Sequence, residues 1–224
     1  MPGNAVILGV VCARAGSKGL PGKNVRSLRG KPLLNWSIDH AISTPEIDKL
    51  VVTADFPLDS RYHEYSIGRP KDLAGDTVSK WDVWQWVANY WESQGGELDA
   101  ICDLDPTQPL RTVDDVSGTI NAWTGGVTAA VGQSNLSPYY DILEKMPSGA
   151  YRICLGGGAY ACRQNLPESY TQAGIYVVSR EALRTRKFLF DGNVHGYEMP
   201  RERSFDINDE TDWRIVEHFM TATR

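Results

Sequence analysis

The fold is decided by the first apolar stretch, AVILGVV (residues 5–11), and by the loop that follows it, ARAGSKGLPGKN (residues 13–24). A continuous run of branched apolar residues is typical of a strand buried on both faces of a parallel sheet. The loop combines three glycines with the cations Arg14, Lys18 and Lys23. Backbone N–H groups freed by glycine, together with cationic side chains, bind polyphosphates. The stretch therefore predicts a strand followed by a phosphate-binding loop, the alternative being a mobile basic turn.

The loop differs from two common phosphate-binding motifs. Ser17 stands where the Walker A pattern GxxxxGK[ST] requires its first glycine, and Asn24 replaces the hydroxyl that binds Mg²⁺. Ser17 also breaks the spacing of GxGxxG. Because the next helix is expected to begin only near Pro32, the loop must wrap around a ligand rather than present it to a helix N-terminus.

Composition is typical of a globular protein with a single domain over residues 1–224. Apolar residues make up 42% and charged residues 23%, and the net charge is −5. The acidic balance disfavours nucleic acid and anionic membranes as partners. The N-terminal apolar run is too short to span a membrane and has no basic segment before it. The cysteines at positions 12, 102, 154 and 162 form no CxxC pair, so we expect reduced thiols and a cytoplasmic protein.

Strands and helices alternate along the rest of the chain. Further strands are predicted at 50–55, 99–105, 127–132, 171–179 and 194–200, helices at 32–42, 77–91, 112–123 and 208–220, and a hairpin at 140–155. This order indicates an α/β sandwich with a mostly parallel sheet. Ligands of such sheets bind beyond the carboxyl ends of the strands, which points to the loops after residues 11, 55, 105 and 132.

The glycine-rich loop and five later segments resemble the CMP-sialic acid synthetases, the acylneuraminate cytidylyltransferases, including their legionaminic and pseudaminic acid-type relatives. The later segments follow the family's order: GRPKDLAGDT (68–77), LDPTQPLRTVDDV (104–116), Arg163-Gln164, QAGIY (172–176) and FDINDETDW (205–213). The resemblance implies an α/β, Rossmann-like three-layer nucleotide-diphospho-sugar transferase fold with a mostly parallel mixed sheet. It also implies a small hairpin insertion, about residues 138–170, at the interface of a homodimer.

The resemblance further implies a reaction. CTP and a sialic-acid-like 2-keto acid sugar (N-acetylneuraminate, legionaminate or similar) would give the CMP-sugar and pyrophosphate. The anomeric hydroxyl attacks the α-phosphorus in line, so the protein must position both substrates and neutralise charge. The alternatives are a CMP-3-deoxy-octulosonate-type synthetase, a phosphate-loop kinase or NTPase, and a non-catalytic nucleotide-binding relative.

The resemblance also assigns site residues, at the positions of this sequence that match the family's motifs. Nucleotide binding is expected from Arg14, Ser17, Lys18, Lys23, Asn24, Arg69, Asp76 and Thr77, with Arg14, Lys18 and Lys23 also catalytic. Sugar binding is expected from Asp105, Gln108, Arg163, Gln172 and Tyr176, with Arg163 holding the sugar carboxylate.

Mg²⁺ is the implied cofactor, and two departures from the family pattern bear on it. The family places two aspartates one residue apart, whereas this chain has Asp206 and Asn208, and an amide brings no charge to a metal. An acidic run before a helix is also a common capping sequence. Asp105 stands where the sialic acid enzymes have Gln, so its carboxylate has three open roles: metal ligand, partner of a sugar hydroxyl or amine, or structural hydrogen bond. Asp103, two residues earlier on the strand, points the same way.

Overall fold

The computed structural model describes residues 5–134, 143–153 and 168–222. Within this part of the chain, the main sheet has seven strands in the order β11-β7-β10-β6-β1-β4-β5. These strands are β1 (Ile7–Cys12), β4 (Lys49–Ala54), β5 (Ser66–Gly68), β6 (Ala100–Leu104), β7 (Val127–Ser134), β10 (Ser169–Ser179) and β11 (His195–Met199). The predicted strands are all present, and β5 is an additional edge strand between the predicted strand at 50–55 and the next predicted helix.

Strand direction confirms the mostly parallel mixed sheet. Strand β1 pairs parallel with β4 and β6, and the pairs β4–β5 and β7–β11 are also parallel. Strand β10 runs antiparallel to both of its neighbours, β6 and β7. Its pairing with β7 is interrupted between Gln172 and Tyr176. Gly174 lies in this bulge with a φ of +64°, a conformation that glycine adopts without strain.

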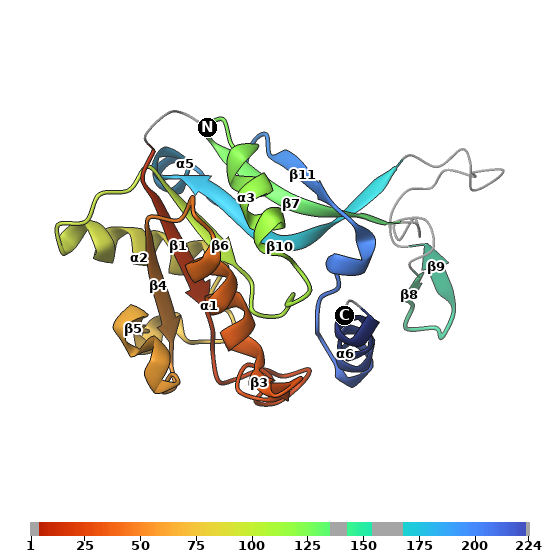
Figure 1. Cartoon of the computed structure of the whole chain (residues 1–224). Coiled ribbons are helices and arrows are strands. Elements are labelled where there is room, and N and C mark those ends of the chain that lie inside the picture. Colours follow the sequence, from red (N-terminus) through yellow and green to blue (C-terminus); the bar gives the residue numbers. More distant parts are fainter. Residues whose placement is uncertain (1–4, 135–142, 154–167, 223–224) are drawn as a thin grey trace.

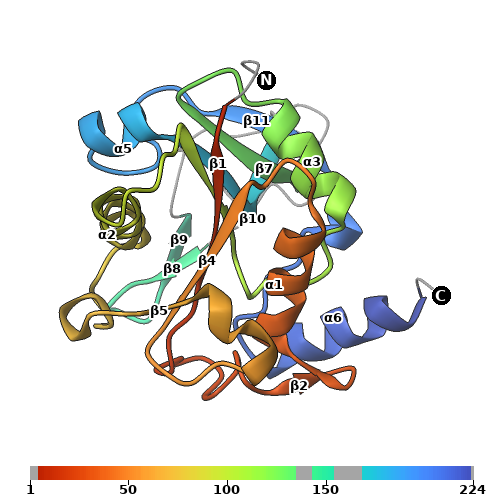
Figure 2. The same ribbon diagram turned by 60° about the vertical axis from the view of Figure 1, so that its left-hand side comes forward.

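Helices cover both faces of the sheet, which gives three layers (Figure 2). Helices α1 (Leu33–Ser43) and α3 (Val113–Asn121) lie on one face, and α2 (Lys80–Ser93) and α5 (Arg180–Thr185) lie on the other. Alternate residues of β1 pack on opposite faces of the sheet. Ile7 belongs to the core under α1, and Leu8 belongs to the core that contains Trp84 of α2. The alternation of strands and helices in the sequence therefore produces the layers directly.

The glycine-rich loop packs against the C-terminal helix, α6 (Glu210–Ala222), in a separate apolar cluster (Figure 1). This cluster joins Leu20 and Leu28 to Trp213. Short elements fill the connections: β2 (Ser27–Leu28), β3 (Lys31–Pro32), and the 3₁₀ turns η1 (Ser60–Tyr65), η2 (Lys71–Leu73) and η4 (Arg201–Arg203). The C-terminal helix thus holds the glycine-rich loop in place.

The predicted hairpin is present as β8 (Leu143–Lys145) and β9 (Tyr151–Ile153), which pair antiparallel. It projects away from the layered body (Figure 1). The remainder of the expected insertion, about residues 138–170, lies largely outside the described residues, as do Arg163, Cys154 and Cys162. A search of the described residues found no helix of the length and apolar character needed to cross a membrane.

Candidate active site

The glycine-rich loop lines a cavity of about 490 Å³ beyond the carboxyl end of β1. The described lining consists of Cys12, Arg14, Ser17, Lys18, Gly19, Lys23, Asn24, Arg69, Gly75, Asp76, Val78, Lys80, Asp105, Pro106, Thr107 and Asn208. All but one of the predicted nucleotide-binding residues therefore meet in one place. Thr77 is exposed and lies beside this lining rather than in it. Cations outnumber carboxylates in the lining, which suits a polyphosphate.

Two cations of the loop pair with one carboxylate across this cavity. Asp76 Oδ2 lies 2.8 Å from Lys18 Nζ, and Asp76 Oδ1 accepts from Arg14 Nη1. These hydrogen bonds lower the pKa of Asp76. The Lys18 side chain is 77% exposed, so its pairing adds little to folding. The two cations already converge on one anionic group, as a phosphate would require.

Asn24 and Arg69 fix the shape of the cavity. The Asn24 amide donates to Arg14 O at 2.9 Å, and its buried Oδ1 has no hydrogen-bond partner among the described residues. Arg69 donates to Leu73 O at 2.9 Å and to Ala13 O at 3.1 Å. Arg69 therefore joins the loop after β1 to the stretch 68–77.

The C-terminal segment reaches the same loop. Lys23 Nζ donates to Ile207 O at 2.6 Å, and a Cβ at Gly19 would lie 2.4 Å from Asn208 O. Only glycine permits so close an approach of two backbones. The segment with Asp206 and Asn208 therefore lies against the glycine-rich loop.

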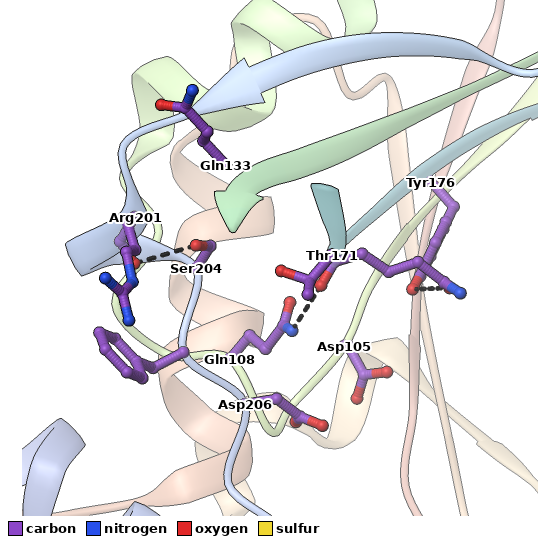
Figure 3. Close-up of a pocket in the computed structure, with 10 residues that line it drawn as sticks. Asp105, Gln108, Gln133, Thr171, Tyr176, Arg201, Ser204 and Asp206 are labelled. Carbon is purple, nitrogen blue, oxygen red and sulfur yellow. Dashed lines mark hydrogen bonds between the residues drawn. The ribbon is translucent and has the colours of Figure 1, made fainter. Parts of the chain in front are cut away.

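A second cavity, of about 530 Å³, adjoins the first and shares Asp105 with it. Its described lining is Asp105, Gln108, Gln133, Thr171, Gln172, Tyr176, Arg201, Ser204, Phe205 and Asp206. The described residues predicted to bind sugar all line it, whereas Arg163 lies outside the described part of the chain. Figure 3 shows Asp105, Gln108 and Asp206 close together, with Arg201 farther away.

Hydrogen bonds order the polar wall of this second cavity. Tyr176 Oη donates to Gln172 Oε1 at 2.8 Å, and Gln108 Nε2 donates to Gln172 O at 3.1 Å (Figure 3). The bulge in β10 makes room for Gln108, because a Cβ at Gly174 would lie 2.2 Å from Gln108 Oε1. Burial and the neighbouring charges hold the pKa of Tyr176 above its ordinary value, so it stays a hydroxyl donor.

Lys80 links the two carboxylates at the end of β6. Its Nζ lies 2.5 Å from Asp103 Oδ2 and 2.9 Å from Asp105 Oδ2. The pKa of Asp105 is lowered to about 2, because the charge and hydrogen bond of Lys80 outweigh the effect of burial. Burial keeps the pKa of Asp103 raised despite the same partner. The expectation that both carboxylates point the same way is confirmed.

Asp206 has the properties of a cation ligand, and Asn208 supports it. Burial, and then the charge of Asp105, raise the pKa of Asp206, and its buried Oδ1 has no hydrogen-bond partner among the described residues. Asn208 Nδ2 donates to Asp206 Oδ2 at 3.1 Å. The residues described contain no group of three or more His, Cys, Asp or Glu arranged to hold a metal. A hard cation that keeps waters and phosphate oxygens needs only one or two protein ligands, so the donor set fits Mg²⁺.

Sequence reasoning missed several residues that line these cavities. Lys80 is the most consequential, and Thr107, Gln133, Thr171, Arg201, Ser204 and Phe205 also line them. One signal marks Lys80 in the sequence: it begins a helix, where the helix dipole disfavours a cation. A cation at that position needs an anionic partner, which is what Asp103 and Asp105 supply.

Comparisons with known proteins point to cytidylyltransferases. A family model described as "Cytidylyltransferase" matches residues 8–60. "Post-translational flagellin modification protein B" of Campylobacter coli is 27% identical over 96% of this chain and 94% of that protein. "CMP-N,N'-diacetyllegionaminic acid synthase" of Campylobacter jejuni is 27% identical over 97% of this chain and 96% of its own length. "N-acylneuraminate cytidylyltransferase" of Streptococcus agalactiae is 26% identical over 94% of this chain but only 52% of its own length.

A solved structure shares the fold. CMP:2-keto-3-deoxy-manno-octonic acid synthetase, complexed with CTP, matches with a TM-score of 0.70 and 16% identity over 98% of this chain and 100% of that chain. The predicted three-layer nucleotidyltransferase fold is thereby confirmed.

The family model and the named relatives indicate a nucleotidyltransferase. The comparisons support the CMP-sialic acid synthetase family of cytidylyltransferases, which the motifs of this chain resemble. The chain spans about half the length of the N-acylneuraminate cytidylyltransferases that it matches, and nearly all of the CMP-legionaminic acid synthase.

Proposed function

We propose that the chain joins CMP from CTP to a sialic-acid-like 2-keto acid sugar and releases pyrophosphate. The observation that carries this proposal is the meeting of two cavities at Asp105, one lined by the cationic loop and the other by polar side chains. A triphosphate and a polyhydroxylated sugar acid would lie in adjacent spaces with their reacting atoms at the junction. Held this way, two substrates react as though one were intramolecular.

On the nucleotide side, the loop would bind the triphosphate. Arg14, Lys18 and Lys23 would neutralise the charge that develops on the α-phosphate and on the leaving pyrophosphate. To do so, Arg14 and Lys18 would exchange the Asp76 carboxylate for phosphate oxygens. The loop would thus be preorganised by Asp76 before the nucleotide arrives.

On the sugar side, the acid carboxylate needs a cationic partner, and a guanidinium is the natural one. Arg163 keeps this proposed role from the family resemblance, and Arg201 lines the described part of the same cavity. Gln108, Gln172 and Tyr176 would bind hydroxyl and amide groups. The hairpin insertion would complete the cavity from a second copy of the chain in a homodimer, and Leu143 and Tyr151 of the hairpin are 55% and 61% exposed.

Asp206 would hold Mg²⁺, with Asn208 beside it. The ion supplies charge neutralisation to phosphate oxygens when bound. Asp105 is better suited to the sugar than to the metal, because Lys80 already neutralises it at 2.9 Å.

Product analysis tests the proposal. The purified protein is incubated with CTP, Mg²⁺ and, in separate reactions, N-acetylneuraminate, a legionaminate and 3-deoxy-octulosonate. We expect pyrophosphate release and a CMP-sugar with a nine-carbon acid. CDP formation would indicate a kinase, and binding of CTP without either product would indicate a non-catalytic relative.

A further inference from the structure

Three charged side chains meet where the two cavities join. Lys80 lies between Asp103, whose side chain has no exposed surface, and Asp105, whose side chain is 30% exposed. The Lys80 ammonium also lies 5.2 Å from the centre of the Tyr176 ring and 5.6 Å from that of Trp84. One carboxylate is therefore sealed in the core, while the other remains accessible to a ligand.

The accessible carboxylate is fixed at both oxygens. Lys80 holds Oδ2 of Asp105, and the hydroxyl of Thr107 donates to Oδ1 at 3.1 Å. The main chain is held as well, because the buried Arg111 donates to Asp105 O and the Asp105 N–H donates to Gly174 O at 2.8 Å. Oδ1 also accepts from the Thr107 N–H at 3.4 Å, so Oδ2 is the oxygen that retains a further lone pair for a ligand donor.

Stability alone does not explain this arrangement. A buried ion pair contributes little net stability relative to apolar residues, because desolvation offsets the attraction. A metal role for Asp105 is also disfavoured, because a cation would have to approach the Lys80 ammonium. The remaining feature is position: Asp105 belongs to both cavities, where the sugar would meet the nucleotide.

We propose that Lys80 is a positioning residue that holds Asp105 as a fixed anionic hydrogen-bond acceptor for the sugar acid. The site then selects sugar acids that bring an O–H or N–H donor to the junction of the two cavities. Asp103 supplies the second anchor that fixes the Lys80 ammonium at the edge of the nucleotide cavity. This inference rests on the proposed function and assigns a basis for its sugar selectivity.

Two variants separate positioning from folding. Lys80→Met leaves Asp103 buried without its cation, so we expect a lower melting temperature and a higher KM for the sugar acid. Lys80→Met combined with Asp103→Asn removes both members of the buried pair, so the melting temperature should recover. The KM for the sugar acid should stay raised by about tenfold to a hundredfold, the loss expected for a misplaced hydrogen bond to a charged group. The KM for CTP should change by less than about threefold, because the loop cations are untouched and Lys80, although it lines the nucleotide cavity, is already paired with two carboxylates.

The control is Lys71→Met, which removes an exposed lysine from η2 and should leave the KM of both substrates unchanged. Recovery of the sugar KM together with the melting temperature in the double variant would overturn the inference and leave only a structural role. An equal rise in the KM for CTP would also overturn it, since Lys80 would then act on the nucleotide. If the wild-type protein forms no CMP-sugar from any sugar acid, the proposed function fails and this inference fails with it. If the wild-type protein forms the CMP-sugar and the double variant has a normal KM for the sugar acid, this inference fails while the proposed function stands.

Discussion

Lys18 and Asp76 form an ion pair, 2.8 Å between Nζ and Oδ2, that joins the loop after β1 to the loop after β5. Both side chains are substantially exposed, and Asp76 takes a second cation, Arg14. A surface pair of this kind contributes little stability. Its importance lies in placing two cations together at the mouth of the nucleotide cavity.

Lys18→Ala should therefore reduce catalysis without affecting folding. Removing one preorganised electrostatic contact to developing charge costs about 10²–10³ in rate, so kcat/KM for CTP should fall by that factor. The melting temperature should stay unchanged, because the side chain is 77% exposed. Steady-state kinetics and a thermal melt measure both quantities, with Lys71→Ala as the matched exposed lysine. Near wild-type kcat/KM in Lys18→Ala would show that this loop does not hold the triphosphate.

Metal dependence should follow Asp206 and Asn208 rather than Asp105. Asn208→Asp adds a carboxylate beside the existing one and should lower the Mg²⁺ concentration for half-maximal rate or leave it unchanged. Asp206→Asn should raise that concentration by at least about tenfold. Asp105→Asn should leave it unchanged, because Lys80 already neutralises that carboxylate. The initial rate of each variant is measured as a function of Mg²⁺ concentration. If Asp105→Asn needs more Mg²⁺ for half-maximal rate, Asp105 is a metal ligand.

Gly174→Ala should damage the sugar cavity and the fold together. The new Cβ would lie 2.2 Å from Gln108 Oε1 and 3.0 Å from Asp105 Cβ, on a backbone with a φ of +64°. Left-handed backbone and overpacking each cost about 1–3 kcal/mol, so the free energy of unfolding should fall by about 2–6 kcal/mol. Gly68→Ala, which has no atom within 4 Å of the new Cβ, is the control for urea denaturation. Equal stability of the two variants would mean that the bulge is not constrained by Gln108.

Stability should fall on mild acidification because of His40 on α1. Burial, followed by the charges of Arg111 and Lys31, lowers the pKa of His40 to about 4, and its Nδ1 is buried without a partner in the described part of the chain. Protonation is easier in the unfolded state, so stability is complete above the unfolded pKa of about 6.5 and is lost as the pH falls toward 4. The loss should be about 1–3 kcal/mol, measured by urea denaturation near pH 7 and pH 5. His40→Gln should remove most of this difference, and His218→Gln should leave it unchanged. If the wild-type protein and both variants lose the same free energy of unfolding between pH 7 and pH 5, His40 is not the cause.

The layers of the fold could be predicted from the sequence, because the spacing of apolar residues and the positions of glycines can be read from short segments of the chain. AVILGVV predicts β1, and the start of α1 after Pro32 follows from the apolar spacing of that segment. The antiparallel direction of β10 has no such local signal, since a strand of either direction shows the same alternation. The three-residue strand β5 is too short to show a pattern.

The candidate site was predicted as far as the family motifs extend. Those motifs identified Asp105, Gln108 and Tyr176, and the structure brings all three to one cavity. Lys80 lies outside the quoted motifs, and its partners come from a different segment, β6. Only packing of α2 against the sheet brings these charges together, and no local pattern reports that contact.

The central claim is tested most directly by following both ends of the triphosphate. CTP labelled with ³²P at the α-phosphate, and separately at the γ-phosphate, is reacted with Mg²⁺ and N-acetylneuraminate or a legionaminate, and the products are separated by chromatography. We expect the α-label in a CMP-sugar and the γ-label in pyrophosphate, in equal amounts. Transfer of the γ-label to the sugar with release of CDP, or recovery of both labels in unreacted CTP with every sugar acid, would contradict cytidylyl transfer.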